Sequence, residues 1–199
     1  MIEKKSTKWL VRIGVLIAII VLMSFTHIGY LNVGTVDITF LMIPVIIGAI
    51  TLGAKSGAIL GAVFGITSFI QCFGMSPFGA TLLAINPVFT FLTCMVPRTL
   101  MGWLTGIIFK ALYKKDNTKG HALSFIVPSI AAPLLNTLLF TSFIIILFGS
   151  SDYITTIQAG RNLLAFVAWF VGINGVIEAA VSFIVGGSVS KAIYKVVNK

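Results

Sequence analysis

The chain has 199 residues, of which 58% are hydrophobic and only 10% are charged, and its mean hydropathy is +1.08. A soluble domain carries roughly 25% charged residues, so this composition excludes a water-soluble catalytic domain and indicates a chain embedded in a lipid bilayer. The net charge of +9 would also suit a nucleic-acid binder, and the placement of the basic residues decides between the two.

Six apolar segments follow one another along the chain, separated by polar or Gly/Pro-rich stretches. Because a spanning helix takes about 20 apolar residues, they predict one all-α membrane domain over residues 1–199, a compact bundle of six transmembrane helices. The second segment is short for a span, so it either borrows residues from Asp37 onward or lies partly inside the protein. The predicted spans cover about 11–25, 40–52, 56–73, 88–112, 123–148 and 163–184.

The basic residues lie almost entirely on one side of this six-span arrangement. Of the 14 lysines and arginines, Arg161 falls on the opposite side and Arg98 lies within the fourth segment. The positive-inside rule places the basic side in the cytoplasm, so both termini are predicted to be cytoplasmic. The charge therefore indicates orientation and contact with anionic lipid rather than nucleic-acid binding. The remaining basic residues are Lys4, Lys5, Lys8, Arg12, Lys55, Lys110, Lys114, Lys115, Lys119, Lys191, Lys195 and Lys199.

Small residues recur at intervals of four in the apolar segments. Gly57, Gly61 and Gly65 share one face of the third segment. They predict close packing within the molecule, because backbones that approach closely supply the attraction between helices in lipid. Gly14 and Ala18 form a weaker pair in the first segment, which suits either internal packing or contact with a partner in the membrane.

The sequence contains none of the patterns that membrane enzymes or ATPases require. Its five acidic residues and two histidines form no H-E-x-x-H, no paired carboxylates at helical spacing, no G-x-S-x-G and no P-loop. Cys72 and Cys94 lack metal-ligand spacing and are interpreted as buried free thiols. We therefore expect no enzymatic activity, no metal and no cofactor, and a chain that does not couple ATP hydrolysis by itself.

Two charged residues, Arg98 and Glu178, lie deep in the apolar segments. Placing either in lipid costs about 2.5–3.5 kcal/mol or more, so each is expected to face the protein interior or water. The simplest interpretation is a mutual ion pair. The alternatives are an anionic ligand group bound by Arg98, or a proton relay through Glu178.

Uncharged polar residues in or beside the spans favour a polar cavity that opens to the outside. An amide in hydrocarbon needs hydrogen-bond partners, which helix packing alone also supplies. Long outer loops with aromatic and amide side chains would suit a cover for a small molecule, and ordinary solvated connectors explain them almost equally well. The amides are Gln71, Asn86, Asn136 and Asn174, and the loops add Asn32 and Tyr153.

In their order, these motifs resemble the S component of energy-coupling factor (ECF) transporters, which is the vitamin-binding subunit. The resemblance covers nearly the whole chain, and no single motif in it is specific. The similar stretches are Ile43 to Ala49, Gly57 to Gly65 with Ser68-Phe69, Asn86-Pro87, Val96-Pro97-Arg98 with Gly102, Asn136 to Phe140, and Asn174 with Glu178.

The resemblance implies a subunit in the plasma membrane of a prokaryote that captures a water-soluble vitamin outside and has no ATPase of its own. It implies two kinds of partner, a membrane T component and two cytosolic ATPases. Family members contact the T component through an AxxxA-type surface on the first span, and Gly14 and Ala18 occupy that place here. The first position is glycine instead of alanine, and no second copy follows.

The pantothenate-type subgroup is the most similar, and pantothenate is an anion with hydroxyl and amide groups. Asparagine and glutamine side chains together with Arg98 or Arg161 would suit it. A neutral vitamin such as pyridoxine would need only amides and aromatic residues such as Tyr153 and Trp169, and riboflavin and folate are further alternatives. A small secondary transporter or a membrane enzyme is a more remote interpretation of the same sequence.

Overall fold

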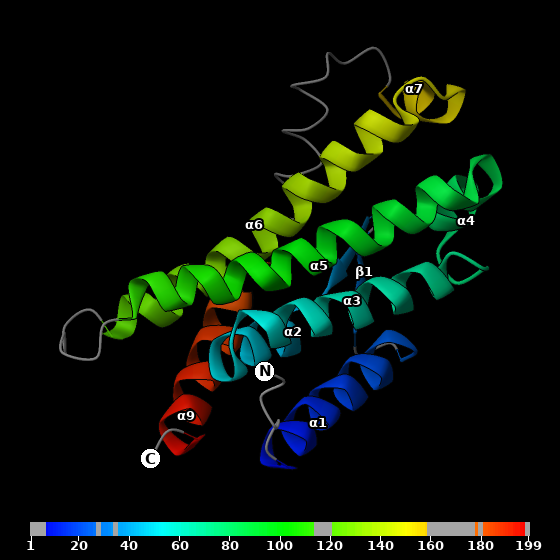
Figure 1. Cartoon of the computed structure of the whole chain (residues 1–199). Coiled ribbons are helices and arrows are strands. Elements are labelled where there is room, and N and C mark those ends of the chain that lie inside the picture. Colours follow the sequence, from blue (N-terminus) through cyan, green and yellow to red (C-terminus); the bar gives the residue numbers. More distant parts are fainter. Residues whose placement is uncertain are drawn as a thin grey trace, which may run out of the picture.

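The computed structural model describes residues 7–26, 29–33, 36–113, 121–158, 178 and 181–197. Within these ranges the chain is mostly helical and contains one two-stranded antiparallel sheet (Figure 1). The elements in chain order are α1 (Thr7–Ser24), β1 (Tyr30–Val33), β2 (Val36–Thr39), α2 (Met42–Leu52), α3 (Ala54–Gln71), α4 (Pro77–Ile85), α5 (Pro87–Leu112), α6 (His121–Phe148), α7 (Asp152–Gln158), the π-helix η1 (Ser182–Gly187) and α9 (Ser188–Val197).

Four of the described helices, α1, α3, α5 and α6, are long and apolar enough to cross a bilayer. The fifth apolar helix, α2, has 11 residues, which is well short of the roughly 20 that a span requires. Most of its side chains are buried, so α2 is enclosed by the other helices. It does not extend toward Asp37, because residues 36–39 form β2.

The predicted span at 163–184 lies mostly outside the described residues. Of that segment the structure describes Glu178, which is helical, and the stretch from Val181 into η1. The count of six spans and the cytoplasmic placement of both termini therefore stay predictions.

Glycines on α3 allow its backbone to pack directly against the backbone of α5, as their four-residue spacing predicts. A Cβ atom added at Gly57 would overlap the carbonyl oxygen of Gly102, and one added at Gly61 would overlap that of Arg98. At Gly65 the added atom would lie 2.9 Å from the carbonyl oxygen of Cys94. The three glycines thus form one face, and the intramolecular packing that we expected for them is confirmed. Figure 1 shows the two helices side by side along their length.

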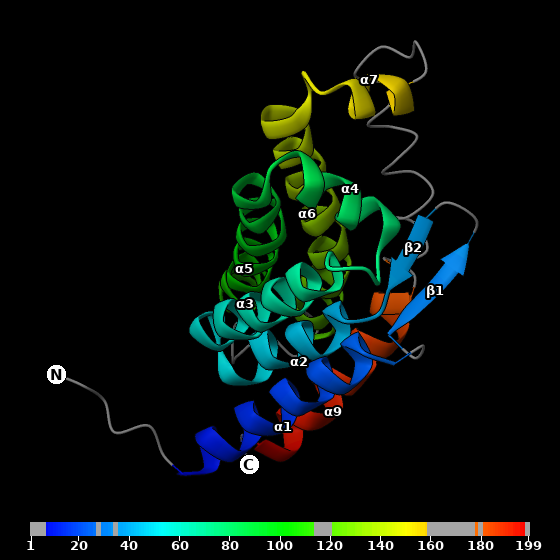
Figure 2. The same ribbon diagram turned by 90° about the vertical axis from the view of Figure 1, so that its right-hand side faces the viewer.

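Between α1 and α2 the chain forms a β-hairpin, where the sequence predicted a loop in an all-α fold. Strands β1 and β2 pair antiparallel with Tyr30 opposite Thr39. The physical reason is that apolar and polar residues alternate over residues 31–33 and again over 36–39, which is a strand pattern. Figure 2 shows the hairpin projecting beside the ends of α1 and α2.

Two further helices, α4 and α7, occupy segments that the sequence analysis treated as loops. Each begins at a capping residue that satisfies free backbone N–H groups. The Ser76 hydroxyl accepts the Gly79 N–H at 3.2 Å, and Pro77 occupies the first turn, where its missing N–H costs nothing. The Ser151 hydroxyl accepts the Ile154 N–H at 3.4 Å at the start of α7. These short helices shorten the loops at one end of the bundle.

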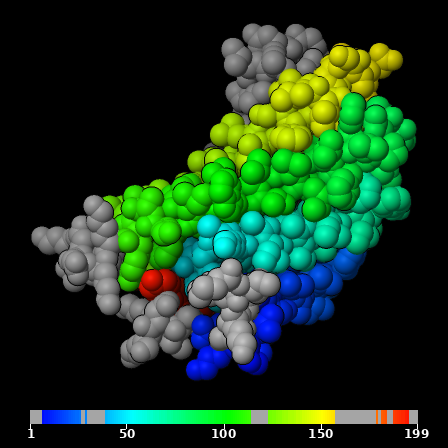
Figure 3. Space-filling view, in the orientation of Figure 1, coloured from blue at the N-terminus to red at the C-terminus, as the bar shows by residue number. Residues whose placement is uncertain are grey.

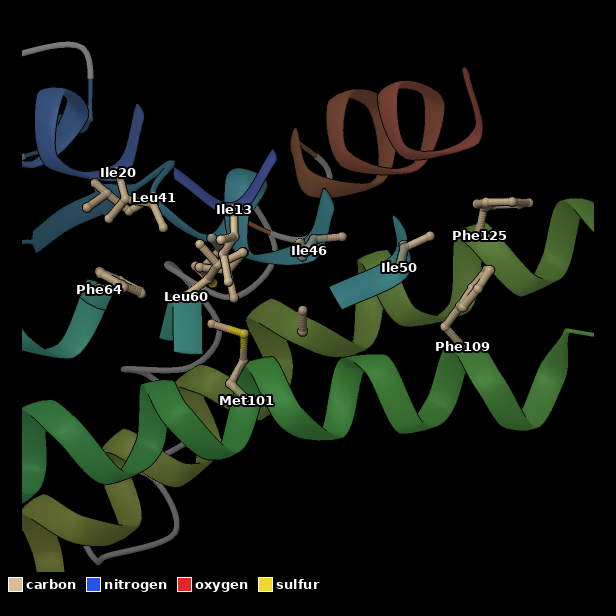
Figure 4. Packing of buried hydrophobic residues seen from close by; sticks show 13 residues of the cluster. Ile13, Ile20, Leu41, Ile46, Ile50, Leu60, Phe64, Met101, Phe109 and Phe125 are labelled. Carbon is tan, nitrogen blue, oxygen red and sulfur yellow. The ribbon is translucent and has the colours of Figure 1, made fainter. Parts of the chain in front are cut away.

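The main hydrophobic core lies where α2 meets α1, α3, α5 and α6. Figure 4 shows Ile13 of α1 beside Leu60 and above Met101, with Ile46 and Ile50 of α2 continuing the cluster toward Phe109 and Phe125. The core extends to Phe109 and Phe125, whose rings stand 5.2 Å apart between centroids. Tyr194 of α9 packs against both rings, so the C-terminal helix closes the end of the bundle where α5 stops.

Helix α1 lies at the edge of the molecule and contacts α2 and α3. Its inward face carries Ile13 and Ile20, whereas Val11, Val15 and Leu22 are exposed on the opposite face. In Figure 3 α5 (green) crosses the front of the molecule and α1 (blue) lies along its lower border. One whole side of α1 is thus left without cover by the described residues.

Candidate substrate site

The side chain of Arg98 lies between α3, α5 and α6 and is partly buried. Its guanidinium carbon lies 4.3 Å from the ring centroid of Phe140 on α6 and 5.6 Å from that of Phe64 on α3. These are cation–π distances, so two aromatic rings hold the charged group in place. Phe64 itself belongs to the buried core (Figure 4).

A proline in α5 provides the hydrogen-bond acceptor that orients Arg98. Pro97 lies inside the helix and has no N–H, so the carbonyl of Thr93, four residues earlier, lacks its usual helical partner. The Nη1–H of Arg98 donates to that carbonyl oxygen at 2.7 Å. The Val-Pro-Arg sequence therefore creates both the free acceptor and the donor that fills it.

On α5 and α6, four polar side-chain atoms are buried and have no hydrogen-bond partner within the described residues. We name their residues, two on α5 and two on α6, the Arg98 cluster: Thr93, Arg98, Asn136 and Thr141. The atoms are the Nε–H donor of Arg98, the acceptor Oδ1 of Asn136 and the two threonine hydroxyls. Asn136 lies one helical turn from Phe140 on the same face, and Phe140 contacts Arg98.

Such atoms are costly when they are left unpaired. A buried donor or acceptor without a partner costs about 1–3 kcal/mol, and native proteins keep few of them. A cationic donor, an amide acceptor and two hydroxyls together suit a ligand that presents a carboxylate together with hydroxyl or amide groups. The Arg98 cluster is therefore the strongest candidate for a ligand-binding group in the described part of the chain.

The ion pair between Arg98 and Glu178, which was the simplest interpretation of the sequence, is absent. Both residues belong to the described part of the chain, and no ion pair joins them. Glu178 is buried, and its Oε1 accepts the backbone N–H of Thr39 at 3.0 Å. Arg98 is held by Thr93 and the two rings instead, so its charge is not neutralised by a carboxylate among the described residues.

Two of the predicted amides make structural hydrogen bonds. The Nε2–H of Gln71 on α3 donates to the carbonyl oxygen of Ser24 at the end of α1. The Oδ1 of Asn86 accepts the N–H groups of Val88 and Phe89 at 3.0 and 3.1 Å and caps α5. Helix packing and helix capping thus explain these two residues, and their role as substrate ligands stays a prediction.

The remaining candidates are spread over other elements or lie outside the described residues. Tyr153 of α7 packs with its ring centroid 6.0 Å from that of Phe78 on α4, within a second apolar cluster. Asn32 lies on β1 opposite Asp37. Three more lie outside the described residues: Arg161, Trp169 and Asn174.

The predicted docking residues occupy the uncovered side of α1. Gly14 and Ala18 are both exposed, and a Cβ atom added at Gly14 would meet nothing within 4 Å. Of the two interpretations that the sequence left open, internal packing does not fit the described contacts of Gly14. Contact with a partner stays a prediction.

Sequence reasoning missed the two phenylalanines that hold Arg98 and the two threonines of its cluster. Phe64 and Phe140 are ordinary apolar residues in long apolar helices, and no spacing rule distinguishes them. Threonines in such helices usually bond to their own backbone, so the unpaired hydroxyls of Thr93 and Thr141 emerge only from the packing. A weak signal was available for Phe140, which lies four residues after Asn136.

Residues 8–186 match the family model described as "ECF transporter, substrate-specific component". This match covers most of the chain. The chain belongs to this family. It is therefore a substrate-specific component of a transporter, and its family together with its long apolar helices supports a prokaryotic membrane protein.

Two curated relatives are similar to this substrate-specific component over most of their sequences. It is 25% identical over 202 residues to "Pantothenate transporter PanT" of Leuconostoc mesenteroides subsp. mesenteroides, covering 99% of this chain and 97% of that protein. It is 31% identical over 151 residues to "Pantothenic acid transporter PanT" of Lactococcus lactis subsp. cremoris, covering 70% and 73% of the two chains.

Proposed function

We propose that this substrate-specific component captures pantothenate from outside the cell and delivers it inward when it docks on a T component that carries two cytosolic ATPases. The chain would then be the recognition subunit of an ATP-driven vitamin importer. Its termini would be cytoplasmic, on the side where twelve of its fourteen basic residues fall.

The Arg98 cluster is the observation that carries the choice of substrate. Pantothenate has a carboxylate, which suits the unpaired Nε–H of Arg98. Its hydroxyl and amide groups can donate to Oδ1 of Asn136 and exchange hydrogen bonds with Thr93 and Thr141. A charge-assisted hydrogen bond contributes about 1.5–3 kcal/mol, so the carboxylate would account for much of the discrimination against neutral vitamins. The names of both relatives support the same substrate.

The docking part of the proposal rests on α1. Its exposed face presents two small residues, Gly14 and Ala18, among large apolar ones. Small residues let a neighbouring helix backbone approach closely, which is the main source of attraction between helices in lipid. The absence of a nucleotide-binding motif from the sequence requires that ATP hydrolysis be supplied by other subunits.

Binding by the purified full-length protein tests the substrate. Native mass spectrometry and isothermal titration calorimetry with pantothenate, pyridoxine, riboflavin and folate should give one tight complex, with pantothenate. Tight binding of a different vitamin with no pantothenate signal would reassign the substrate. In liposomes, pantothenate uptake should require ATP, the T component and the ATPases, and uptake by this chain alone would refute the coupling.

A further inference from the structure

Glu178 is a buried carboxyl group that reaches across the molecule to the β-hairpin. It is 4% exposed, and its Oε1 accepts the N–H of Thr39, a residue 139 positions earlier, at 3.0 Å. This is its one hydrogen bond within the described part of the chain. Burying a carboxylate costs free energy unless it is hydrogen-bonded. The bond to Thr39 therefore helps to stabilise Glu178 in its buried position.

Thr39 is the residue at which the hairpin passes into α2. It ends β2, opposite Tyr30, and its hydroxyl accepts the N–H of Leu41 at 3.3 Å. The next residue, Phe40, donates its N–H to the carbonyl oxygen of Gly29 at 2.9 Å. A restraint on the N–H of Thr39 therefore fixes both the base of the hairpin and the first turn of α2. Figure 2 shows the base of the hairpin beside the orange segment that contains η1.

Two positive charges near the Glu178 carboxylate also favour its negative charge: the partial charge at the start of α2 and the charge of Arg98. The N-terminus of a helix carries partial positive charge, and a nearby anion is stabilised there by about 0.3–1 kcal/mol or more. Glu178 binds the N–H of Thr39, which lies three residues before α2 begins at Met42. The positive charge of Arg98 acts on the same carboxylate, although no ion pair joins these two described residues.

The absence of that ion pair matters for the substrate. If Arg98 were paired with Glu178, a substrate carboxylate would have to displace a carboxylate of the protein. Instead Arg98 donates to the carbonyl of Thr93 and stacks on two rings, and Glu178 is engaged by a backbone N–H. Arg98 and Glu178 thus have separate partners, and among the described residues the Nε–H of Arg98 has no hydrogen-bond acceptor.

We propose that Glu178 is a positioning residue whose carboxylate fixes the junction of the β-hairpin and α2 and thereby leaves Arg98 for the substrate anion. The first part stands on the hydrogen bond to Thr39. The second part rests on the proposed function, because it takes the Arg98 cluster as the place where the substrate carboxylate binds.

Three substitutions separate the roles of Glu178. Glu178→Gln keeps an Oε1 acceptor and removes the charge. Glu178→Asp keeps the charge and withdraws the acceptor by one methylene, and Glu178→Ala removes both. Asp152→Asn, at an exposed acid on α7, is the matched control for loss of a negative charge.

Hydrogen exchange of the ligand-free full-length protein in lipid nanodiscs measures how stable the junction between the β-hairpin and α2 is. In Glu178→Ala and Glu178→Asp the amides of residues 36–41 should exchange at least tenfold faster than in the unsubstituted protein. In Glu178→Gln and Asp152→Asn they should not change. Unchanged exchange in Glu178→Asp, or equally fast exchange in Glu178→Gln, would overturn the proposal. Glu178→Asp keeps the test valid if Glu178→Ala fails to fold.

Pantothenate affinity tests the second part on the same proteins. Glu178→Gln should bind pantothenate at least as tightly as the unsubstituted protein, because the hairpin is retained and Arg98 loses a competing negative charge. Glu178→Asp should bind at least tenfold more weakly. Loss of binding in Glu178→Gln with normal exchange would refute the second part alone. If the unsubstituted protein binds no pantothenate, the proposed function fails while the exchange results still decide the role of Glu178.

Discussion

Polar side chains inside the helices fall into two groups, depending on whether their own helix satisfies them. Thr105 and Thr137 donate to the carbonyls of Met101 and Pro133, at 2.7 and 3.0 Å. Such a bond is the usual way for a hydroxyl to enter an apolar helix. Thr93 and Thr141 have no hydrogen-bond partner in the part of the chain that the structure describes. This difference makes Thr93 and Thr141 candidates for hydrogen bonds to the proposed substrate.

Replacing Arg98 with glutamine should weaken pantothenate binding by about 10- to 150-fold, which corresponds to the loss of about 1.5–3 kcal/mol from a charge-assisted hydrogen bond. Calorimetry on the purified protein measures the effect. Pantothenol, in which a neutral hydroxymethyl group replaces the carboxylate, should lose far less affinity in the same variant. Lys110→Gln, at an exposed cation on the same helix, is the control. Equal losses for both ligands would show that Arg98 does not meet the carboxylate.

Thr141→Val and Thr137→Val form a matched pair one turn apart on α6. Valine fills nearly the same volume as threonine, so the first substitution removes an unpaired buried hydroxyl and the second a paired one. Thr141→Val should leave thermal stability unchanged or raised and reduce pantothenate affinity by about 2- to 10-fold, the value of a neutral hydrogen bond. Thr137→Val should leave affinity unchanged. A thermal-shift assay and calorimetry check both, and the reverse pattern would remove Thr141 from the site.

Among the helices, the contact between α3 and α5 is the one on which the candidate site depends. Gly61 touches the backbone of Arg98 itself, so the spacing of these two helices sets where the guanidinium stands. On the other side of the guanidinium group, Phe140 of α6 contacts Arg98. The site is thus built on three long helices instead of on loops, which favours a fixed geometry.

Gly61→Ala should destabilise the protein by about 1–3 kcal/mol, because an added methyl group in a packed contact forces the backbones apart. The same separation should weaken pantothenate binding. Gly14→Ala introduces the identical change where nothing lies within 4 Å and should be neutral or slightly stabilising. Denaturation in detergent measures the free energy of unfolding of the two variants. A Gly61→Ala protein as stable as the Gly14→Ala protein would contradict the close packing.

The long elements and their packing could be predicted from the sequence, whereas the site could be predicted only in part. Apolar length indicated α5 and α6, and the four-residue glycine spacing indicated the contact that Gly57 and Gly61 make. Arg98 and Asn136 were recognised because polar groups are rare in such helices. The hairpin was missed because the alternation over residues 30–39 is short and lies between two apolar segments, where a connecting loop was expected. The pairing of Arg98 was predicted wrongly because sequence distance does not reveal that Thr39 engages Glu178.

For the molecule as a whole, the uncovered face of α1 is the surface that we propose for contact with the T component. Gly14→Leu should leave pantothenate binding by the isolated chain unchanged, because Gly14 points away from the bundle. It should abolish co-purification with the T component and ATP-dependent uptake, because a large side chain prevents close approach of another helix. Ile19→Leu, which conserves size on the same helix, is the control. Normal uptake by Gly14→Leu would move the docking surface elsewhere.

The attachment of α1 also bears on how permanent such an assembly is. Near one end the indole N–H of Trp9 donates to the Ser56 hydroxyl at 3.1 Å, and at the other end the Ser24 hydroxyl donates to that of Thr67 at 2.9 Å. The helix is therefore fastened to its own bundle at both ends, and a partner can pack on its middle without detaching it. Exchange of lipid tails for apolar side chains yields little free energy, so the proposed association would depend on close packing of the two helix surfaces. With docking through α1, as we propose, a subunit fastened in this way would leave its energising complex after delivery and return to it with the next vitamin.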